Sequence, residues 1–484
     1  MFAWRNRAAL CVALLAACAQ GDMQGAQREP TLTREQLLDP ETCRGCHPLH
    51  YREWASSMHA YAARDPVFIA MNKRGQRETG GELGDFCVKC HAPMALREGA
   101  TRDGLNLDEV PEHLQGVTCY FCHNAVAVGD HFNADIELAN DRVMRGGMAN
   151  APSTNAHGSA YSSLHDRNHR DSSALCGACH DIVTPNGVRL ERTFAEYKAS
   201  VFGTSEQSFE TCGGCHMDER DSPARDPHRD AAPRRHQHLW AGVDVAITDF
   251  PDREAQRAAV ECQLALSARI AAIDHDGAGT FLVRFETDAG HSQPSGAAQD
   301  RRMWLEFIAY AADGSVLFAS GDIGDGELEE KADDDPSYDR NLVLFRDRIY
   351  DERGDPVHMF WEAAPSAAHP DGYRSLLLPA ATETMPAHAL EARYLVPEPE
   401  RVARVTARLR IRPIGMDVLH DLVASGDLDE ELLAEMPTFT LHGAAVEWTP
   451  TSSRLRSLWP DDLECPEAYV CLLEPQAEEC SPNR

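Results

Sequence analysis

Five copies of one pentapeptide constrain this chain more than any other feature. Each copy reads Cys-x-x-Cys-His, and together they use ten of the 16 cysteines in 484 residues. Random placement of 16 Cys and 22 His would produce far fewer than one such pentapeptide, so the repetition needs a chemical explanation. The copies are Cys43–His47, Cys87–His91, Cys119–His123, Cys176–His180 and Cys212–His216.

The spacing within each copy predicts covalent attachment of a c-type haem. Two thiols one helical turn apart can each add to a vinyl group on one porphyrin edge, and the adjacent His then reaches the iron. Zinc sites and thioredoxin-like redox pairs also use Cys-x-x-Cys, but they do not need a His after every copy. We therefore predict five haems. The predicted thioether residues are Cys43, Cys46, Cys87, Cys90, Cys119, Cys122, Cys176, Cys179, Cys212 and Cys215, and the proximal ligands are His47, His91, His123, His180 and His216.

The N-terminus has the pattern of an export signal. Arg5 and Arg7 precede an apolar run over residues 8–17, which is too short for a stable membrane anchor. Export takes the chain to an oxidising compartment, where c-type haems are attached. We expect a signal peptide over residues 1–17 and a polar tether over residues 18–39.

The apolar run ends in Leu-Ala-Ala followed by Cys18, which resembles the bacterial lipobox. The resemblance implies that Cys18 receives lipid and holds the protein at a membrane. Ordinary cleavage after a small residue, with Cys18 incidental, is the alternative. The expected location is the periplasm or the outer membrane of a Gram-negative bacterium.

The net charge excludes one large class of function. With 77 acidic and 46 basic residues the formal charge is −31, and binding of nucleic acid phosphates needs the opposite sign. Expected partners are other redox proteins or quinone-linked membrane components. The acidic stretch over residues 326–335 is either a solvated loop or a docking patch for a basic redox partner.

Histidines are in surplus around the motifs. Between Cys43 and Trp240 there are 15 His, and five of them are the proximal ligands. A second His on the far side of an iron makes a closed, low-spin electron carrier, whereas an open side can bind substrate. The surplus favours two His ligands on most or all of the five irons.

Several segments resemble a known family. Residues 43–59, C-x-x-C-H-P-x-x-Y-x-x-W-x-x-S-x-H, resemble the first haem segment of multihaem cytochromes c related to the tetrahaem cytochrome c of hydroxylamine oxidation. Residues 116–123, 156–159 and 212–217 are similar to further haem segments of that family. Residues 235–242 resemble its closing segment, with Trp240 in place of the usual Phe. The resemblance covers about residues 40–242.

The resemblance implies particular distal ligands. The His of the S-x-H step, His59, commonly supplies one in that family, and His157 and His238 lie in two of the other similar segments. Weaker candidates are His113, His165 and His169, while Met58, Met94 and Met217 are alternative ligands or packing residues. The candidate distal ligands are therefore His59, His157, His238, His236 and His291.

The predicted fold is multidomain. Residues 40–242 contain only 32 to 57 residues from one motif to the next, so the porphyrins must supply missing apolar surface. We expect an α/irregular pentahaem cytochrome c domain with short helices, long loops and little regular sheet. Its clearest helix is residues 48–63.

The second half changes pattern to alternating segments separated by turns, which predicts a mainly antiparallel β-sandwich over residues 243–460. The tail over residues 461–484 contains Cys. The predicted strands are residues 280–287, 303–311, 315–320, 341–350, 401–412 and 439–448, with one or two helices over residues 416–436, interrupted near Gly426.

Two features of the second half concern haem ligation and disulfide formation. Residues 290–296 and 301–306 resemble a stretch in the β domain appended to many multihaem cytochromes, where the His, here His291, can reach a haem; a plain loop His is the alternative. The remaining cysteines in this half can form two disulfides by any of three pairings. They are Cys262, Cys465, Cys471 and Cys480.

The favoured function is a pentahaem c-type cytochrome that transfers electrons outside the cytoplasm, through covalently bound haems with mostly two His ligands. The alternative is a multihaem oxidoreductase that acts on a small nitrogen or sulfur compound at one open haem. A third possibility is a binding module in which the β domain recognises a partner and the haems connect it electrically. No catalytic residue is predicted, and an electron carrier is favoured over an enzyme.

Overall fold

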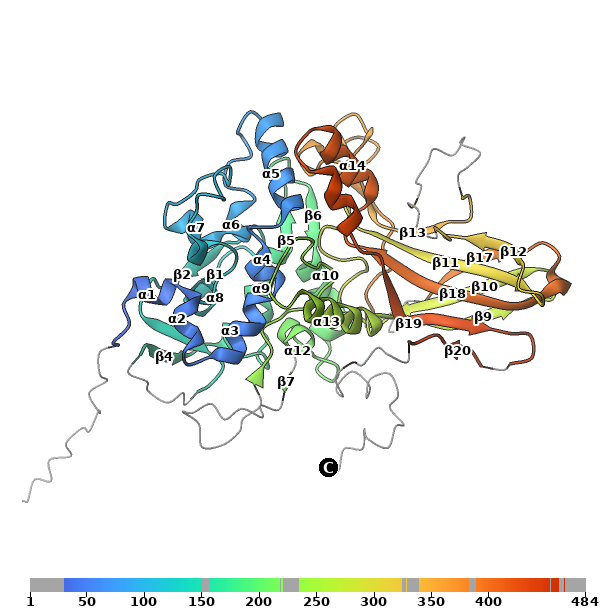
Figure 1. The fold of residues 1–484 in the computed structure, drawn as a ribbon, viewed down its shortest axis with the longest axis horizontal. Helices are drawn as coiled ribbons and strands as arrows, with labels where there is room; N and C mark the ends of the chain where they lie inside the picture. Colours follow the sequence, from blue (N-terminus) through green and yellow to red (C-terminus); the bar gives the residue numbers. More distant parts are fainter. Residues whose placement is uncertain are drawn as a thin grey trace, which may run out of the picture.

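The chain forms two regions that lie side by side in the computed structural model (Figure 1). We name them the haem-motif region, residues 30–242, and the β region, residues 243–460. The predicted signal peptide, Cys18, His228, Cys471 and Cys480 lie outside the described residues, as does almost all of the 326–335 stretch. The described residues are 30–149, 156–217, 219–220, 235–323, 328, 339–382, 389–452, 454–460 and 465.

The haem-motif region consists of short helices joined by loops. The longest of its helices, α5, has 13 residues, and most have four or five. The helices are α1 (Arg34–Leu38), α2 (Pro40–Arg44), α3 (Pro48–Ala55), α4 (Met58–Tyr61), α5 (Pro66–Glu78), α6 (Val88–His91), α7 (Pro93–Arg97), α8 (Cys119–His123), α9 (Ser172–His180), α10 (Thr193–Ala199), α11 (Val201–Thr204) and α12 (Cys212–His216).

Regular sheet is scarce in this region, as predicted. The described strands form separate two-stranded sheets, of which one is parallel. The pairs are β1 (Ala125–Val128) with β2 (Ile136–Leu138), β3 (Val143–Gly146) with β4 (Gly158–Tyr161), β5 (Asp181–Val183) with β6 (Arg189–Arg192), and β7 (Glu219–Arg220) with β8 (Arg235–His236).

The helix expected over residues 48–63 is wrong in its extent, because the structure breaks it into α3 and α4. Ser56 donates its hydroxyl to the carbonyl of Arg52, and the Ser57 side chain accepts from the amide of Ala60 as the N-cap of α4. Serine side chains compete for backbone groups in this way at helix ends. Two adjacent serines therefore end one helix and begin the next.

The described residues of the β region form three antiparallel sheets. One has the order β17-β10-β9, the largest has the order β12-β11-β18-β19-β20 with β13 also paired to β11, and a small one has the order β15-β14-β16. The strands are β9 (Ala268–His275), β10 (Thr280–Thr287), β11 (Arg302–Ala311), β12 (Val316–Ser320), β13 (Val343–Phe345), β14 (Asp347–Tyr350), β15 (Pro356–Val357), β16 (Tyr373–Ser375), β17 (Ala389–Leu395), β18 (Val402–Arg412), β19 (Phe439–Trp448) and β20 (Arg456–Ser457).

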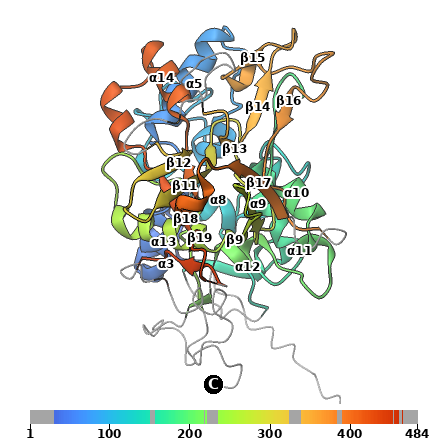
Figure 2. The same cartoon turned by 90° about the vertical axis from the view of Figure 1, so that its right-hand side faces the viewer.

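One apolar core serves the two larger sheets. Phe281 and Phe285 of β10 and Phe307 of β11 are at most 1% exposed and belong to the same cluster of buried side chains. Alternate residues of β10 point into this core, which is the period-two pattern that predicted the strand. The end-on view in Figure 2 shows β11, β18 and β19 in front of the haem-motif region.

Most sequence predictions for this region are confirmed, including the turn after β11. Gly314 has φ +86°, a backbone conformation that glycine adopts without strain, and the amide of Ala311 donates to Ser315 across the turn. The predicted helical stretch is also interrupted where expected: α14 (Met416–Ala424) ends before Gly426, which has φ +77°, and a 3₁₀ helix follows over Glu430–Glu435.

Two features of the β region differ from prediction. The strand expected over residues 341–350 is split at Arg346, because β13 pairs with β11 while β14 joins the small sheet. Arg346 is buried and donates to the carbonyl of Gln299, so the chain turns from one sheet to the other around this side chain. Helix α13 (Arg253–Ala265) was not predicted.

The two regions meet through an apolar cluster. Val67 and Ala70 of α5 pack with Val418, Leu419 and Leu422 of α14, and Figure 1 shows these helices side by side. Apolar burial of this kind is the main source of stabilisation between packed elements. The two regions therefore share a continuous interface.

Two further observations concern a disulfide and the length of the helices. A disulfide joins Cys262 of α13 to Cys465. This bond is compatible with one of the three pairings predicted for the four cysteines of the second half. Within the described part of the chain, no helix has both the length and the apolar character needed to cross a bilayer.

Candidate haem-binding sites

The five motifs lie on single helical turns, and we number the sites 1 to 5 in chain order. The backbone amide of His47 donates to the carbonyl of Cys43 at 2.8 Å, and His91 donates to Cys87 at 3.1 Å. One turn of helix brings both thiols and the imidazole of a motif to one side of the chain. All ten motif cysteines are free thiols, as thioether formation requires.

Four of the five proximal candidates face a second histidine. Two imidazoles on opposite faces of one iron, each with a metal–nitrogen bond of about 2 Å, have ring centroids about 6 Å apart. The observed separations have this size although the partners are far apart in sequence. The pairs are His47 with His157 at 6.4 Å, His123 with His238 at 6.3 Å, His180 with His59 at 6.4 Å, and His216 with His291 at 6.3 Å.

Hydrogen bonds orient most of these rings for metal binding. A ligating His usually donates its second ring N–H to a carbonyl, which fixes the tautomer and leaves the other nitrogen for the metal. Here the Nδ1 atoms lie 2.6 to 3.2 Å from backbone carbonyl oxygens, so Nε2 is the atom left free to bind a metal. The rings are those of His123, His157, His216, His238 and His291.

Burial favours the neutral form of several of the paired imidazoles. It lowers the pKa of His59 to about 3 and the pKa values of His180 and His291 to about 4, and the neighbouring histidines lower all three further. The pKa of His238 is also well below its usual value, because of burial and then His50. Only a neutral imidazole can bind a metal, so these rings are ready to bind at neutral pH.

Site 2 differs from the other four. The imidazole of His91 stacks on Phe68 of α5, with ring centroids 4.0 Å apart and planes 3° from parallel. Its Nδ1 lies 3.2 Å from the carbonyl oxygen of Ala62, so Nε2 is again left free to bind a metal. Among the described residues, no second histidine ring contacts His91. Sequence reasoning missed Phe68, because nothing in an apolar helix position indicates which ring it will touch.

The other predicted distal candidates have different surroundings. The backbone carbonyl of His236 accepts from Nδ1 of His238, so His236 supports a neighbouring ring. Nε2 of His165 lies 2.7 Å from the carbonyl oxygen of Cys122, although its ring is also 5.6 Å from that of His123. His238 fits His123 better than His165 does, because its ring lies at 6.3 Å, the separation that one iron requires, and its Nδ1 contact leaves Nε2 free.

Three more candidates have surroundings of other kinds. His169 accepts through Nδ1 from the amide of Asp171, Met94 is fully buried in an apolar cluster, and Met58 lines a small cavity with Asp65 and Asp244. These contacts are those of structural residues.

Thiols of different motifs lie against one another, which orders the sites in space. The thiol of Cys43 of site 1 lies beside that of Cys119 of site 3, Cys90 of site 2 beside Cys179 of site 4, and Cys176 of site 4 beside Cys212 of site 5. Burial and then the neighbouring Cys179 raise the pKa of the Cys122 thiol, so sites 3 and 4 lie close together. The contacts give the order 1, 3, 4, 5, with site 2 beside site 4.

A partly buried ion pair lies near sites 2 and 4. Arg301 binds Asp244 through two hydrogen bonds of 2.9 and 2.8 Å. Asp244 opposes the lowering of the pKa by burial at both His91 and His180. The sequence gives no signal for this pair, because its members lie in separate segments.

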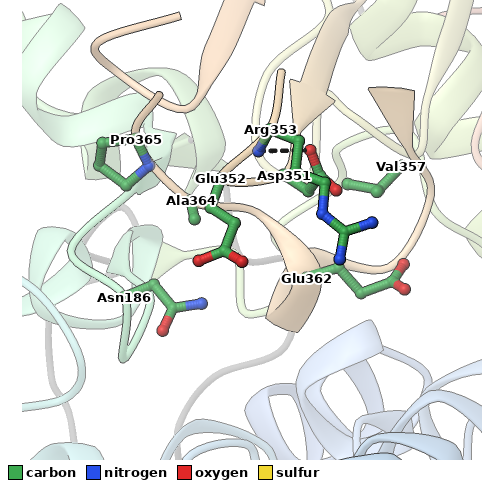
Figure 3. Close-up of a pocket in the computed structure, with 8 residues that line it drawn as sticks. All are labelled: Asn186, Asp351, Glu352, Arg353, Val357, Glu362, Ala364 and Pro365. Atoms are coloured by element: carbon green, nitrogen blue, oxygen red, sulfur yellow. Dashed lines mark hydrogen bonds between the residues drawn. The ribbon is translucent and has the colours of Figure 1, made fainter. Parts of the chain in front are cut away.

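One cavity lies away from the motifs. It has a volume of about 520 Å³ and lies between the loop at Asn186 and residues 351–365 (Figure 3). Its lining includes the carboxylates of Asp351, Glu352 and Glu362 but none of the predicted haem ligands. The redox chemistry of the motifs therefore does not take place in this cavity.

The residues present fit c-type haem. Each motif supplies two free thiols and an imidazole, and four sites supply a second imidazole at the spacing that one iron requires.

Comparison with known proteins agrees with this geometry. Residues 42–124 match the sequence profile of the family described as cytochrome c554 and c-prime. The fold is similar to the crystal structure of a penta-heme cytochrome c552 from Thermochromatium tepidum, with a TM-score of 0.57 and 21% identity over 85% of this chain and 98% of that one. No curated protein matches the chain. The profile covers sites 1 to 3, and the structural match extends over both regions.

Proposed function

We propose that this protein is a pentahaem c-type cytochrome that transfers electrons between redox partners. The observation that carries the proposal is the set of four histidine pairs, each with one member in a Cys-x-x-Cys-His motif and a centroid separation of 6.3 or 6.4 Å. Haem, when bound at these sites, supplies reversible one-electron chemistry at its iron.

The chain holds each closed site in a fixed geometry. The proposed distal ligands are His157 at site 1, His238 at site 3, His59 at site 4 and His291 at site 5. An iron with two imidazoles needs no change of ligand when its charge changes, and backbone carbonyls hold most of the rings. His291 comes from the β region, so site 5 joins the two regions. We also assign the β region to the β-sandwich class, because two antiparallel sheets share its core.

Electrons follow the order of neighbouring attachment sites. The thiol contacts support a path 1–3–4–5, with site 2 as a branch at site 4. Covalent attachment at fixed positions means that transfer along this path needs no large movement of the chain.

The test is the haem content and spin state of the exported protein. Mass spectrometry should show five covalently bound haems per chain, and electron paramagnetic resonance of the oxidised protein should show four low-spin sites with two histidine ligands. Replacing a distal ligand, as in His157→Ala, should convert one low-spin signal to high-spin and leave the others unchanged. Fewer than five haems, or a mainly high-spin spectrum, would contradict the proposal.

A second candidate function rests on site 2. Because the ring contact of His91 is with Phe68 instead of a second histidine, this site suits an open iron that takes a small nitrogen or sulfur compound. The chain would then be an oxidoreductase as well as a carrier. Nitrite, hydroxylamine or cyanide should change the visible spectrum of about one haem in five, and His157→Ala, which opens site 1, provides a positive control. A wild-type spectrum unchanged by all three ligands contradicts this function.

The location and partners follow from the sequence pattern. We assign the protein to the periplasmic side of a Gram-negative cell envelope, attached by lipid at Cys18, with basic redox proteins or quinone-linked membrane components as partners. The formal charge of −31 favours basic partners through electrostatic steering. A Cys18→Ala variant should appear in the soluble periplasmic fraction, while wild type sediments with membranes; equal distribution of both contradicts the lipid anchor.

A further inference from the structure

Trp240 lies between two imidazoles that belong to different sites. Its ring centroid is 4.7 Å from that of His59, the partner of His180 at site 4, and 5.1 Å from that of His238, the partner of His123 at site 3. The planes meet at 83° and 69°, so both contacts are edge-to-face. Aromatic rings prefer this arrangement at such distances, and one indole therefore restrains the planes of both imidazoles.

The backbone at Trp240 is strained. Its φ is +48°, in the left-handed region, which is unfavourable for a bulky side chain. Such a conformation persists only where the surrounding structure fixes it, and it tends to occur at functional positions.

Neighbouring contacts account for the fixed position of Trp240. The amide of His238 donates to Glu53 of α3 at 3.0 Å, and the carbonyl of Ala241 accepts from Nδ1 of His216 at 2.9 Å. The residue before Trp240, Leu239, is buried. The segment 238–241 is thus held on both sides of Trp240 and contacts the ligands of sites 3, 4 and 5.

We infer that Trp240 is a positioning residue that sets the orientation of the distal imidazoles of sites 3 and 4 together and so couples the potentials of these two haems. The inference rests on the ligand assignment in the proposed function. The orientation and hydrogen bonding of an axial imidazole tune the iron that it binds. A single side chain that touches both rings makes the two sites respond jointly to any change at that side chain.

If Trp240 had only a packing role, a different experimental result would be expected. If Trp240 only filled space, its replacement by a smaller side chain would lower stability or haem content and leave the properties of each assembled site as before. If it positions the two rings, the fully loaded protein changes at sites 3 and 4 and at no other site.

The experiment uses the full, exported chain with Trp240→Leu, which removes the aromatic ring, and Trp240→Phe, which retains a smaller one. The low-spin signals are measured by electron paramagnetic resonance, and the potentials by titration followed in the visible spectrum. His59→Met and His238→Met identify which signal belongs to which site, since each alters one ligand. Trp459→Leu, in the β region, controls for the loss of a tryptophan.

In Trp240→Leu the signals and potentials of sites 3 and 4 should both shift, while those of sites 1 and 5 stay as in wild type. Trp240→Phe should shift the signals and potentials of the same two sites by a smaller amount. Three results overturn the inference. They are unchanged signals in a protein that carries all five haems, a shift at only one of the two sites, and an equal shift at all four sites with two histidine ligands. If Trp240→Leu fails to bind five haems, Trp240→Phe decides by the same criteria. Absence of low-spin signals for sites 3 and 4 in wild type overturns the ligand assignment, and this inference with it.

Discussion

The two regions of this molecule are stabilised in different ways. In the β region, strands of up to 11 residues alternate inward and outward side chains and bury a continuous apolar core. In the haem-motif region, helices of four or five residues bring imidazoles and thiols to face one another. Isolated helices of this length are not stable in water. The difference indicates that one region folds from its own apolar pattern, while the other needs its cofactors to complete the core.

The largest expected effect comes from withholding haem. A chain made without its export signal in the cytoplasm is not loaded, so we expect residues 30–242 to lose their structure while residues 243–460 keep theirs. Limited proteolysis with mass spectrometry should find rapid cleavage throughout the first region and a resistant fragment from the second. The fully loaded protein is the control. Equal resistance of both regions in the haem-free chain would show that the haem-motif region does not depend on its cofactors.

The converse experiment weakens the β region alone. Phe307 of β11 is fully buried between the two larger sheets, so Phe307→Ala should lower the free energy of unfolding of this region by about 3–5 kcal/mol. Denaturant titration followed by circular dichroism in the far ultraviolet measures the change. The visible haem spectrum should stay as in wild type in the absence of denaturant. Val316→Ala, at an exposed position of β12, is the matched control. A changed haem spectrum would mean that the regions fold as one unit.

The β region also contains a polar group that works against its stability. Burial raises the pKa of Asp300 to about 6, although Arg302, Arg346 and Arg301 oppose this. The unfolded carboxyl ionises near 4, so above that pH the unfolded state loses its proton first, and the cost to the fold grows until about pH 6.

Asp300→Asn removes that cost. We expect the variant to be more stable than wild type by up to about 3 kcal/mol at pH 8, with a difference that shrinks towards zero at pH 4. Thermal unfolding at several pH values measures this. Glu352→Gln, an exposed carboxyl, should show no such trend. A stabilisation that is the same at pH 4 and pH 8 contradicts the raised pKa.

What could be predicted from sequence also differs between the regions. In the β region a period of two fixes which face of each strand is buried, and strands β10, β18 and β19 lie where the sequence placed them. The split at Arg346 could not be predicted, because whether a strand continues depends on which sheet its two ends join.

In the haem-motif region the sequence identifies the attachment residues but not their partners. A motif is local, so five single-turn sites follow from it directly. A distal ligand is brought in by the fold, and His59 and His180 meet across much of the region. The sequence offers ten further histidines before Trp240 and no rule for choosing among them. The break after Ser56 shows the same limit, since an apolar period alone does not reveal a competing N-cap.

The smallest expected effect concerns the interface between the two regions. Arg77 of α5 makes two hydrogen bonds of 2.6 Å to Asp427 across this interface, but the arginine is half exposed. Water screens the charge of the exposed arginine, and the buried carboxylate of Asp427 keeps a second hydrogen bond from the Ser425 hydroxyl. Arg77→Ala should therefore leave the unfolding midpoint close to that of wild type, whereas Leu419→Ala, in the apolar cluster between α5 and α14, should cost about 2–5 kcal/mol. If Arg77→Ala were the more damaging of the two, charge pairing instead of apolar packing would hold the regions together.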